Sequence, residues 1–255
     1  LQLDRLKGYV RNSNGKFRLI TSKHQLNTYL QDRKLQPRIS AALFGIEGAH
    51  ALEGKISNFD KLYDMGLRLV GLAHFADNHF STALSGERRL DEGLSVAGRA
   101  LVNHILDRHA IIDLVHSSRS ALRDVIAIVK EYNSIHNTSI PLVLSHTFPY
   151  SLGCKDSNRN IEDEYIKLVA SVGGLIGVDF FEDSTCANFS VRKIAKGFRY
   201  FADLVGVEHL SLGSDWDGHV ATPLAADSIV ELVDNLILEN FTDREIFMIL
   251  GENSL

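Results

Sequence analysis

Six short runs of apolar residues recur along the chain, each of a length typical of a β-strand. They are rich in Val, Ile and Leu and cover residues 41–46, 68–73, 110–115, 141–145, 174–180 and 208–213. Within each run the apolar residues are nearly continuous and do not alternate with polar ones, which indicates strands buried on both faces. The pattern therefore predicts a parallel sheet covered on two sides.

The segments between these runs carry apolar residues at helical spacing. Leu101 and Ile105 illustrate it in 94–109, and the same spacing occurs in 119–136, 161–172 and 227–239. Strands that alternate with amphipathic helices predict an α/β fold built of βα units. No repeat, low-complexity tract or proline-rich linker interrupts the series, so we expect residues 1–255 to form one domain.

Titratable side chains stand at or just after the ends of five of the six runs: Glu47, His74, His116, His146 and Asp215. Parallel strands in a barrel gather their carboxyl ends on one face, where active sites of this architecture lie. One such residue alone is more often a loop residue with its hydrogen bonds satisfied. The repetition favours a shared, solvated cleft, and we predict that the five side chains converge.

Composition excludes several classes of partner. The 255 residues include 27 Lys and Arg against 32 Asp and Glu, so the chain lacks the basic excess of a nucleic-acid binder. No stretch reaches the roughly 18 apolar residues that a membrane span needs. Cys154 and Cys186 form no CxxC pair and signal neither a disulfide framework nor a thiolate zinc site. Any metal must be held by His and carboxylate, and the scarcity of cysteine favours the cytoplasm.

The residues around the strand ends resemble the motifs of the membrane (renal) dipeptidase family, peptidase family M19. The matching segments, in the family's order, are 45–50 (GIEGAH), 72–74 (LAH), 112–117 (IDLVHS), 144–146 (LSH), 159–161 (RNI) and 213–218 (GSDWDG). Members of this family are zinc hydrolases of the amidohydrolase-like barrel class. The resemblance implies a (β/α)8 TIM-like barrel and a metallo-dipeptidase.

The resemblance also implies a metal site. Glu47 corresponds to the family carboxylate that bridges two zinc ions, and His116 and His146 correspond to the imidazoles that complete one of the two sites. A carboxylate and two histidines with an open position suit a catalytic zinc, which activates a bound water. That water would attack the peptide carbonyl of a dipeptide.

Three further residues receive roles from the resemblance. Asp215 matches the acidic residue that accepts the proton of the attacking water. His74 matches the histidine that contacts the substrate and helps to stabilise the tetrahedral oxyanion. Arg159 matches the arginine that grips the substrate, because a guanidinium can bind a carboxylate bidentately. We therefore expect a small-molecule substrate, a dipeptide with a free C-terminus, and consider a homodimer as the assembly.

The sequence departs from the family in its N-terminal part. The family's second zinc site uses a His-x-Asp at the end of the first strand, and the only histidine before Glu47 is His24. His24 reads as part of a helix start, and residues 1–40 read as helix and loop. We expect the first one or two strands of the barrel to be absent from this sequence, and a second zinc to need ligands upstream.

Two substitutions concern the substrate. Val115 stands where family members often have Ser, and Phe181 stands where a Tyr often follows an Asn-Phe pair, which is Asp179-Phe180 here. Substrate contacts can differ accordingly.

Two other functions remain open. The same constellation could hydrolyse a lactone, a cyclic amide or a phosphoester, because metal-activated water and an acidic proton shuttle serve all of them. Arg159 favours a substrate that bears a carboxylate. The chain could also be a homologue that binds a metal or ligand without turnover. A His-x-Asp upstream would favour the enzyme, and its absence would favour the binder.

Overall fold

The computed structural model describes residues 2–87, 92–155, 157, 159–186 and 189–255. Its strands are β1 (Phe17–Ile20), β2 (Ser40–Ile46), β3 (Leu67–Gly71), β4 (Ile111–Asp113), β5 (Val143–Pro149), β6 (Asn160–Ile161), β7 (Leu175–Asp179) and β8 (Leu210–Gly213). The helices are α1 (Gln2–Asn12), α2 (Lys23–Leu35), α3 (Ile56–Asp64), α4 (Val96–Asp107), α5 (Arg119–His136), α6 (Asp163–Ala170), α7 (Glu182–Thr185), α8 (Val191–Val205), α9 (Val230–Leu238) and α10 (Asp243–Leu250).

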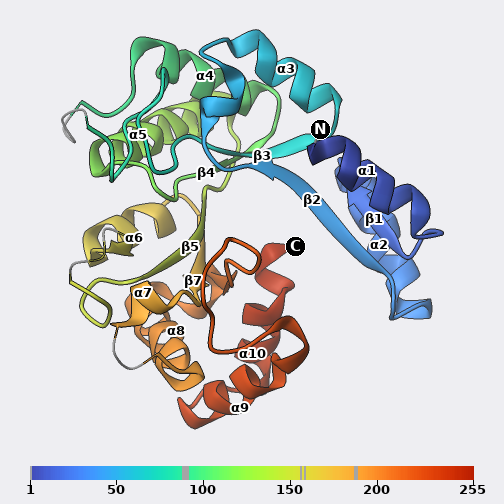
Figure 1. The fold of residues 1–255 in the computed structure, drawn as a ribbon. Coiled ribbons are helices and arrows are strands. Elements are labelled where there is room, and N and C mark those ends of the chain that lie inside the picture. The colour runs from blue at the N-terminus through green and yellow to red at the C-terminus, as the bar shows by residue number, and fades with distance from the viewer. Residues whose placement is uncertain (1, 88–91, 156, 158, 187–188) are drawn as a thin grey trace.

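The strands form one parallel sheet in the order β1-β2-β3-β4-β5-β7-β8, with the short β6 paired to β5 off this path. The sheet curves into a half-barrel with helices on its outer side (Figure 1). Within the described ranges no pairing joins β8 back to β1, so the half-barrel is open. The predicted α/β class with parallel βα units is confirmed.

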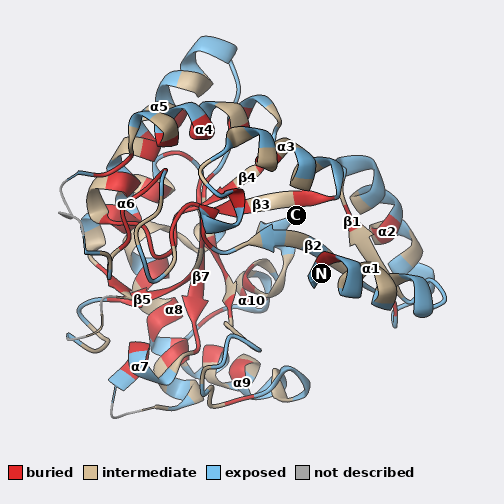
Figure 2. Ribbon diagram, turned by 45° about the horizontal axis from the view of Figure 1, so that its top comes forward, coloured by how far each residue is buried: buried red, intermediate tan, exposed pale blue. Residues whose placement is uncertain are grey.

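Most of the apolar runs form strands that are enclosed on both faces, and the exception is β2, in which no residue is buried. Val70, Ile112 and Ile176, from three different strands, are at most 1% exposed. Ile194 and Phe198 on α8 are fully buried against the sheet. Figure 2 shows β5 and β7 mostly buried, whereas β1 and β2 are mostly intermediate or exposed. The predicted helices in 94–109, 119–136, 161–172 and 227–239 are present as α4, α5, α6 and α9.

The interpretation of residues 1–40 as helix and loop is partly wrong. α2 does begin where predicted, after Ser22, whose side chain accepts a hydrogen bond from the backbone of Gln25. Residues 17–20, however, form β1, which pairs in parallel with β2. In β1 only Ile20 is buried. β1 is short, and its sequence lacks the continuous apolar run by which six of the other strands were identified. The two-residue β6 was not predicted either.

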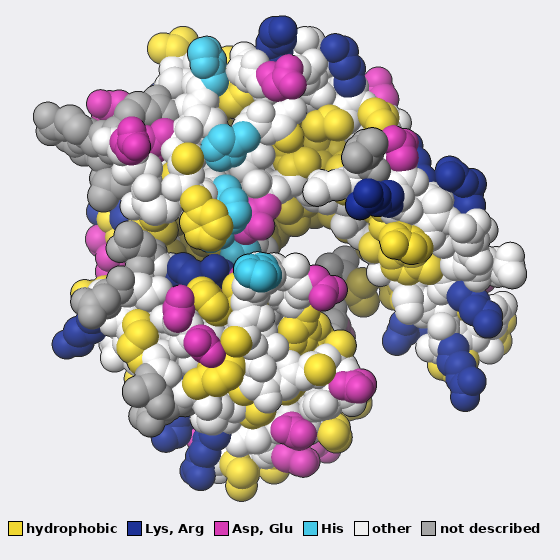
Figure 3. Space-filling model, in the orientation of Figure 1, with side chains coloured by type: hydrophobic (Ala, Val, Ile, Leu, Met, Phe, Trp, Pro, Cys, Tyr) yellow, Lys and Arg dark blue, Asp and Glu magenta, His cyan; other side chains and the backbone are white. Residues whose placement is uncertain are grey.

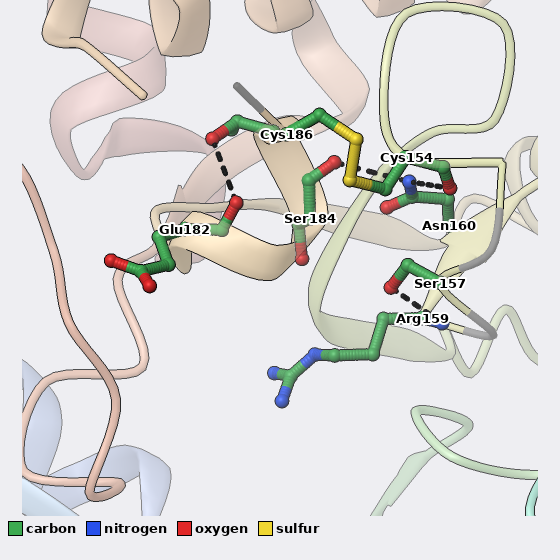
Figure 4. The surroundings of a disulfide bond; sticks show 8 residues. Cys154, Ser157, Arg159, Asn160, Glu182, Ser184 and Cys186 are labelled. Carbon is green, nitrogen blue, oxygen red and sulfur yellow. Dashed lines mark hydrogen bonds between the residues drawn. A yellow bond between two sulfur atoms is a disulfide. The ribbon is translucent and has the colours of Figure 1, made fainter. Parts of the chain in front are cut away.

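The two cysteines are joined, which corrects the expectation that they signal no disulfide. Cys154 and Cys186 form a disulfide with a Cα–Cα distance of 5.0 Å across a sequence separation of 32 (Figure 4). Cys154 follows β5 and Cys186 follows α7, after β7. These loops meet because β5 and β7 are neighbours in the sheet, which the sequence alone does not reveal.

In the part of the chain that the structure describes, no helix combines the length and hydrophobicity needed to traverse a bilayer.

Candidate active site

Three of the predicted site residues meet where the carboxyl ends of β2, β4 and β5 lie together. Glu47 Oε1 lies 3.0 Å from His116 Nε2 and 3.4 Å from His146 Nε2. The two Nε2 atoms are 3.2 Å apart. Parallel strands place their ends on one side of the sheet, so residues 69 and 30 positions away from His116 become neighbours.

The three ligand atoms fit a zinc ion. Zinc bonds to His and carboxylate of about 2.0–2.1 Å in a tetrahedron require ligand atoms about 3.3 Å apart. The observed separations of 3.0, 3.2 and 3.4 Å describe one triangular face of that tetrahedron. His116 and His146 are buried, whereas the Glu47 side chain is 43% exposed. The fourth position can therefore face the solvent.

The electrostatics of this triangle favour a positive charge at its centre. Hydrogen bonds from His116 and His146 hold the pKa of Glu47 well below its ordinary value. Burial lowers the pKa of His146, but the hydrogen bond to Glu47 and the charge of Asp215 outweigh it, so that the pKa is raised overall. A divalent cation would supply this positive charge while the imidazoles bind it in their neutral form.

Neighbouring groups fix the two histidines of the triangle. Ser145 Oγ lies 2.9 Å from His146 Nδ1, which leaves Nε2 for the centre of the site. Asp113, buried at the end of β4, accepts hydrogen bonds from the backbone N–H groups of Val115 and Ser145, at 3.2 and 3.0 Å. Burial raises the pKa of Asp113. This carboxyl group ties together the two strand ends that carry the histidines.

Two site residues have left-handed backbones, with φ of 61° at His116 and 55° at Asp215. Such conformations cost a non-glycine residue on the order of 1–3 kcal/mol and cluster at functional sites. Each redirects the chain directly after a strand end, which turns the side chain toward the cleft.

His74 follows β3 and lies beside the triangle. Its Nε2 is 3.8 Å from Glu47 Oε1, and its ring centroid is 4.7 Å from that of His116. Burial is the main reason that the pKa of His74 lies below its ordinary value. A neutral imidazole here can donate one N–H to an oxygen in the cleft.

Arg159 and Asp215 contact each other. Arg159 Nη2 donates a hydrogen bond to Asp215 Oδ2 at 2.6 Å, and the two side chains are 15% and 13% exposed. The guanidinium carbon also lies 4.7 Å from the centroid of the Phe181 ring. The two residues that the sequence assigned to proton transfer and to substrate binding thus form one ion pair.

A cleft of about 470 Å³ connects these groups, lined among others by Glu47, His74, Arg159, Phe181 and Asp215. Figure 3 shows histidine, acidic, basic and hydrophobic side chains gathered around the hollow in the middle of this face. All six predicted site residues lie in or directly behind this cleft. Their individual roles stay predictions.

Sequence reasoning missed Asp179 as a site residue. Its carboxylate is fully buried, and its Oδ2 lies 3.4 Å from Arg159 Nε. The signal was present, because Asp179 stands near the end of the apolar run 174–180. The other five strand-end residues were identified because they stand at or just after the end of an apolar run.

A family model described as membrane dipeptidase, peptidase family M19, matches residues 1–255. The dipeptidase aclJ of Aspergillus oryzae is 29% identical over 211 residues, which are 81% of this chain and 47% of that protein. The chain thus spans about half the length of this curated relative.

Solved structures share the fold. An amidohydrolase from Pseudomonas aeruginosa superimposes with a TM-score of 0.80 at 22% identity, covering 99% of this chain and 81% of the other. A metallopeptidase from Rhodobacter sphaeroides, solved with a phosphinate mimic of the dipeptide L-Ala-D-Ala, gives 0.84 at 20% identity, covering 98% and 70%. At these identities the likeness shows the fold alone.

Proposed function

The chain belongs to the membrane dipeptidase family, peptidase family M19, and on that premise we propose that it hydrolyses dipeptides with a zinc ion held by Glu47, His116 and His146. The observation that carries the proposal is the triangle of ligand atoms at tetrahedral spacing beside an arginine and an aspartate in one cleft. Zinc bound there would supply Lewis acidity, which activates water and polarises the scissile carbonyl.

Each remaining residue has one task. Asp215 accepts the proton of the attacking water and passes it to the leaving amine, as a general base and then a general acid. His74 donates its N–H to the oxygen on which negative charge develops. Arg159 binds the C-terminal carboxylate of the dipeptide.

The ion pair between Arg159 and Asp215 adds a condition to this scheme. While the guanidinium holds Oδ2 at 2.6 Å, that oxygen of Asp215 is not available to the attacking water. A substrate carboxylate competes with Asp215 for the same donors, so its arrival releases Asp215. Recognition of the free C-terminus and readiness for proton transfer are then one event, which favours dipeptides over lactones or phosphoesters that lack a carboxylate.

One zinc ion is proposed for the described ligands, and a second would need ligands beyond these three. A homodimer stays a prediction. The cytoplasmic location expected from the scarcity of cysteine loses that support, because Cys154 and Cys186 are paired and disulfides persist mainly in oxidising compartments.

The proposal is tested with the full chain, assayed after treatment with a chelator and after addition of zinc. We expect hydrolysis of free dipeptides that chelation abolishes and zinc restores, and little hydrolysis of the matched dipeptide amides or of a lactone. The His146→Ala variant, which lacks one ligand, serves as the control and should not recover with zinc. Activity that survives chelation, or that prefers the lactone, would contradict the proposal.

A further inference from the structure

Asp179, the last residue of β7, is a buried carboxylate directly behind the cleft. The backbone N–H of Phe181 donates to its Oδ1 at 2.9 Å, and the hydroxyl of Ser184 donates to its Oδ2 at 2.6 Å. These two bonds fix the orientation of the carboxylate. Burying a charge is costly unless an opposite charge accompanies it. Among the residues that the structure describes, Arg159 is the side chain within ion-pair distance of Asp179.

The contact is made at the inner edge of the guanidinium. Asp179 Oδ2 lies 3.4 Å from Arg159 Nε. Among the described residues this Nε has no aligned hydrogen-bond acceptor, so the contact is ionic. Asp215 binds the outer edge through Nη2, and the ring of Phe181 lies 4.7 Å from the guanidinium carbon. Arg159 is therefore held on three sides.

The carboxylates of Asp215 and Asp179 differ in whether a substrate can displace them from Arg159. Asp215 lines the cleft, where a substrate can reach its partner atoms. Asp179 is 0% exposed and is fixed by two hydrogen bonds, so no substrate can displace it. When Asp215 gives way, Asp179 remains as the ionic contact that keeps the guanidinium directed at the cleft.

The loop that carries Arg159 is anchored to the same place. Asn160 Nδ2 donates to the backbone oxygens of Cys154 and Ser184, at 2.9 and 3.0 Å. The disulfide from Cys154 to Cys186 ties the loop to the end of α7. Figure 4 shows the Arg159 side chain directed away from this disulfide. The backbone on both sides of the contact between Asp179 and Arg159 is thus held together.

We propose that Asp179 is a positioning residue, which sets the orientation of Arg159 for binding the substrate carboxylate. The inference rests on the proposed dipeptidase function. A negative charge beside Arg159 also weakens the attraction of the guanidinium for any carboxylate. That effect acts on Asp215 and on the incoming carboxylate alike, so it largely cancels in the exchange between them. The net effect of Asp179 on substrate binding is therefore the orientation that it gives to the guanidinium.

The variant Asp179→Asn tests this, because it keeps the shape and one oxygen for the N–H of Phe181 but removes the charge. With the full, zinc-loaded chain we expect KM for a free dipeptide to rise about tenfold, less than the roughly hundredfold that a full 1 Å misplacement can cost. We expect kcat to change by less than about twofold, and kcat/KM for the matched dipeptide amide to stay unchanged.

Two controls separate orientation from general damage. Ser184→Ala loosens the carboxylate without touching Arg159 and should raise KM for the free dipeptide in the same direction, by a smaller factor. In an Arg159→Ala background, Asp179→Asn should cause no further loss of kcat/KM for the free dipeptide, because Arg159, through which Asp179 acts, is absent. An unchanged or lowered KM in Asp179→Asn, or an equal loss on the amide, overturns the proposal.

Thermal unfolding separates the failure of this inference from failure of the proposed function. If the wild type hydrolyses no dipeptide, the proposed function fails, and the ion pair is still measurable. Arg159→Ala leaves Asp179 buried without its cation, so adding Asp179→Asn should raise the Tm above that of Arg159→Ala alone. A double variant that melts at the same or a lower temperature contradicts the pairing of Asp179 with Arg159.

Discussion

Asp215 binds Arg159 through Oδ2, one of the two oxygens that its proposed task in proton transfer can use. The bond to Arg159 is short, at 2.6 Å, and only about an eighth of the Asp215 side chain is exposed, at 13%. A carboxylate so placed is kept in one orientation next to the metal ligands until a competitor arrives. Its left-handed backbone, with φ of 55°, is a further cost borne at this position.

The first prediction concerns the proton acceptor. Asp215→Asn should retain zinc, because Asp215 is not among the three ligand residues. It should lose about 10²–10⁴ in kcat, the usual contribution of a general acid–base group. Metal analysis and steady-state kinetics on the same preparation check both halves. A variant with full activity and the wild-type zinc content would remove Asp215 from the mechanism.

The second prediction concerns the carboxylate clamp. A charged hydrogen bond contributes about 1.5–3 kcal/mol, so Arg159→Ala should lower kcat/KM for a free dipeptide about ten- to a hundredfold. The matched dipeptide amide, which has no carboxylate to bind, should lose nothing and should gain some activity, because Asp215 is freed from Arg159. Arg159→Lys keeps the charge but loses the planar fork, and should fall between wild type and alanine. Equal losses on both substrates would argue against a clamp.

At the scale of the elements, a glycine sets the distance between β7 and β5, the strand that contains His146. Gly177 in β7 lies so close to β5 that a Cβ atom would stand 2.0 Å from the backbone oxygen of Ser145. Ser145 precedes His146, one of the three proposed metal ligands. The close approach of β5 and β7 therefore depends on the absence of a side chain at Gly177, and it sets where His146 lies.

The third prediction follows from this close approach. Gly177→Ala should destabilise the fold by about 1–3 kcal/mol or more, because backbone must move to admit the methyl group. Gly8 in α1 is the matched control, since a Cβ there meets only the end of the Arg11 side chain at 4.0 Å. Gly8→Ala should be neutral or slightly stabilising. Urea unfolding of both variants provides the comparison, and equal stabilities would refute the role of Gly177.

At the scale of the whole molecule, the open half-barrel brings its ligands from separate strands. Glu47 follows β2, His116 follows β4, and His146 lies in β5. An ion held by all three links strands that are not all adjacent in the sheet. Binding to the folded chain alone must stabilise it, by mass action.

The fourth prediction is a rise in Tm with zinc. At a free zinc concentration about a thousand times the Kd, the folded state gains about 4 kcal/mol. Calorimetry of the chelated and zinc-loaded chain should show the rise, and His116→Ala should reduce it strongly. The same rise in wild type and variant would mean that zinc binds elsewhere.

Much of the architecture follows from the order of residues alone. Nearly continuous apolar runs favour burial on both faces, which predicts parallel strands, and five of the six runs contain buried strand residues whereas β2 contains none. Because parallel strands share one carboxyl edge, Glu47, His116 and His146 could be predicted to converge before any distance was known. This reasoning needs only the position of each residue within its own strand.

Contacts between loops were decided by the tertiary structure. The disulfide and the ion pair of Arg159 with Asp215 depend on which strands are neighbours and on how the loops after them turn. β1 escaped notice because its half-exposed residues gain their place from pairing with β2 and not from a run of apolar side chains. Asp179 carried the right signal at its strand end, but only the fold shows that its partner is Arg159. Periodicity reports how one segment is buried, whereas the partner of a charged side chain is set by the packing of distant segments.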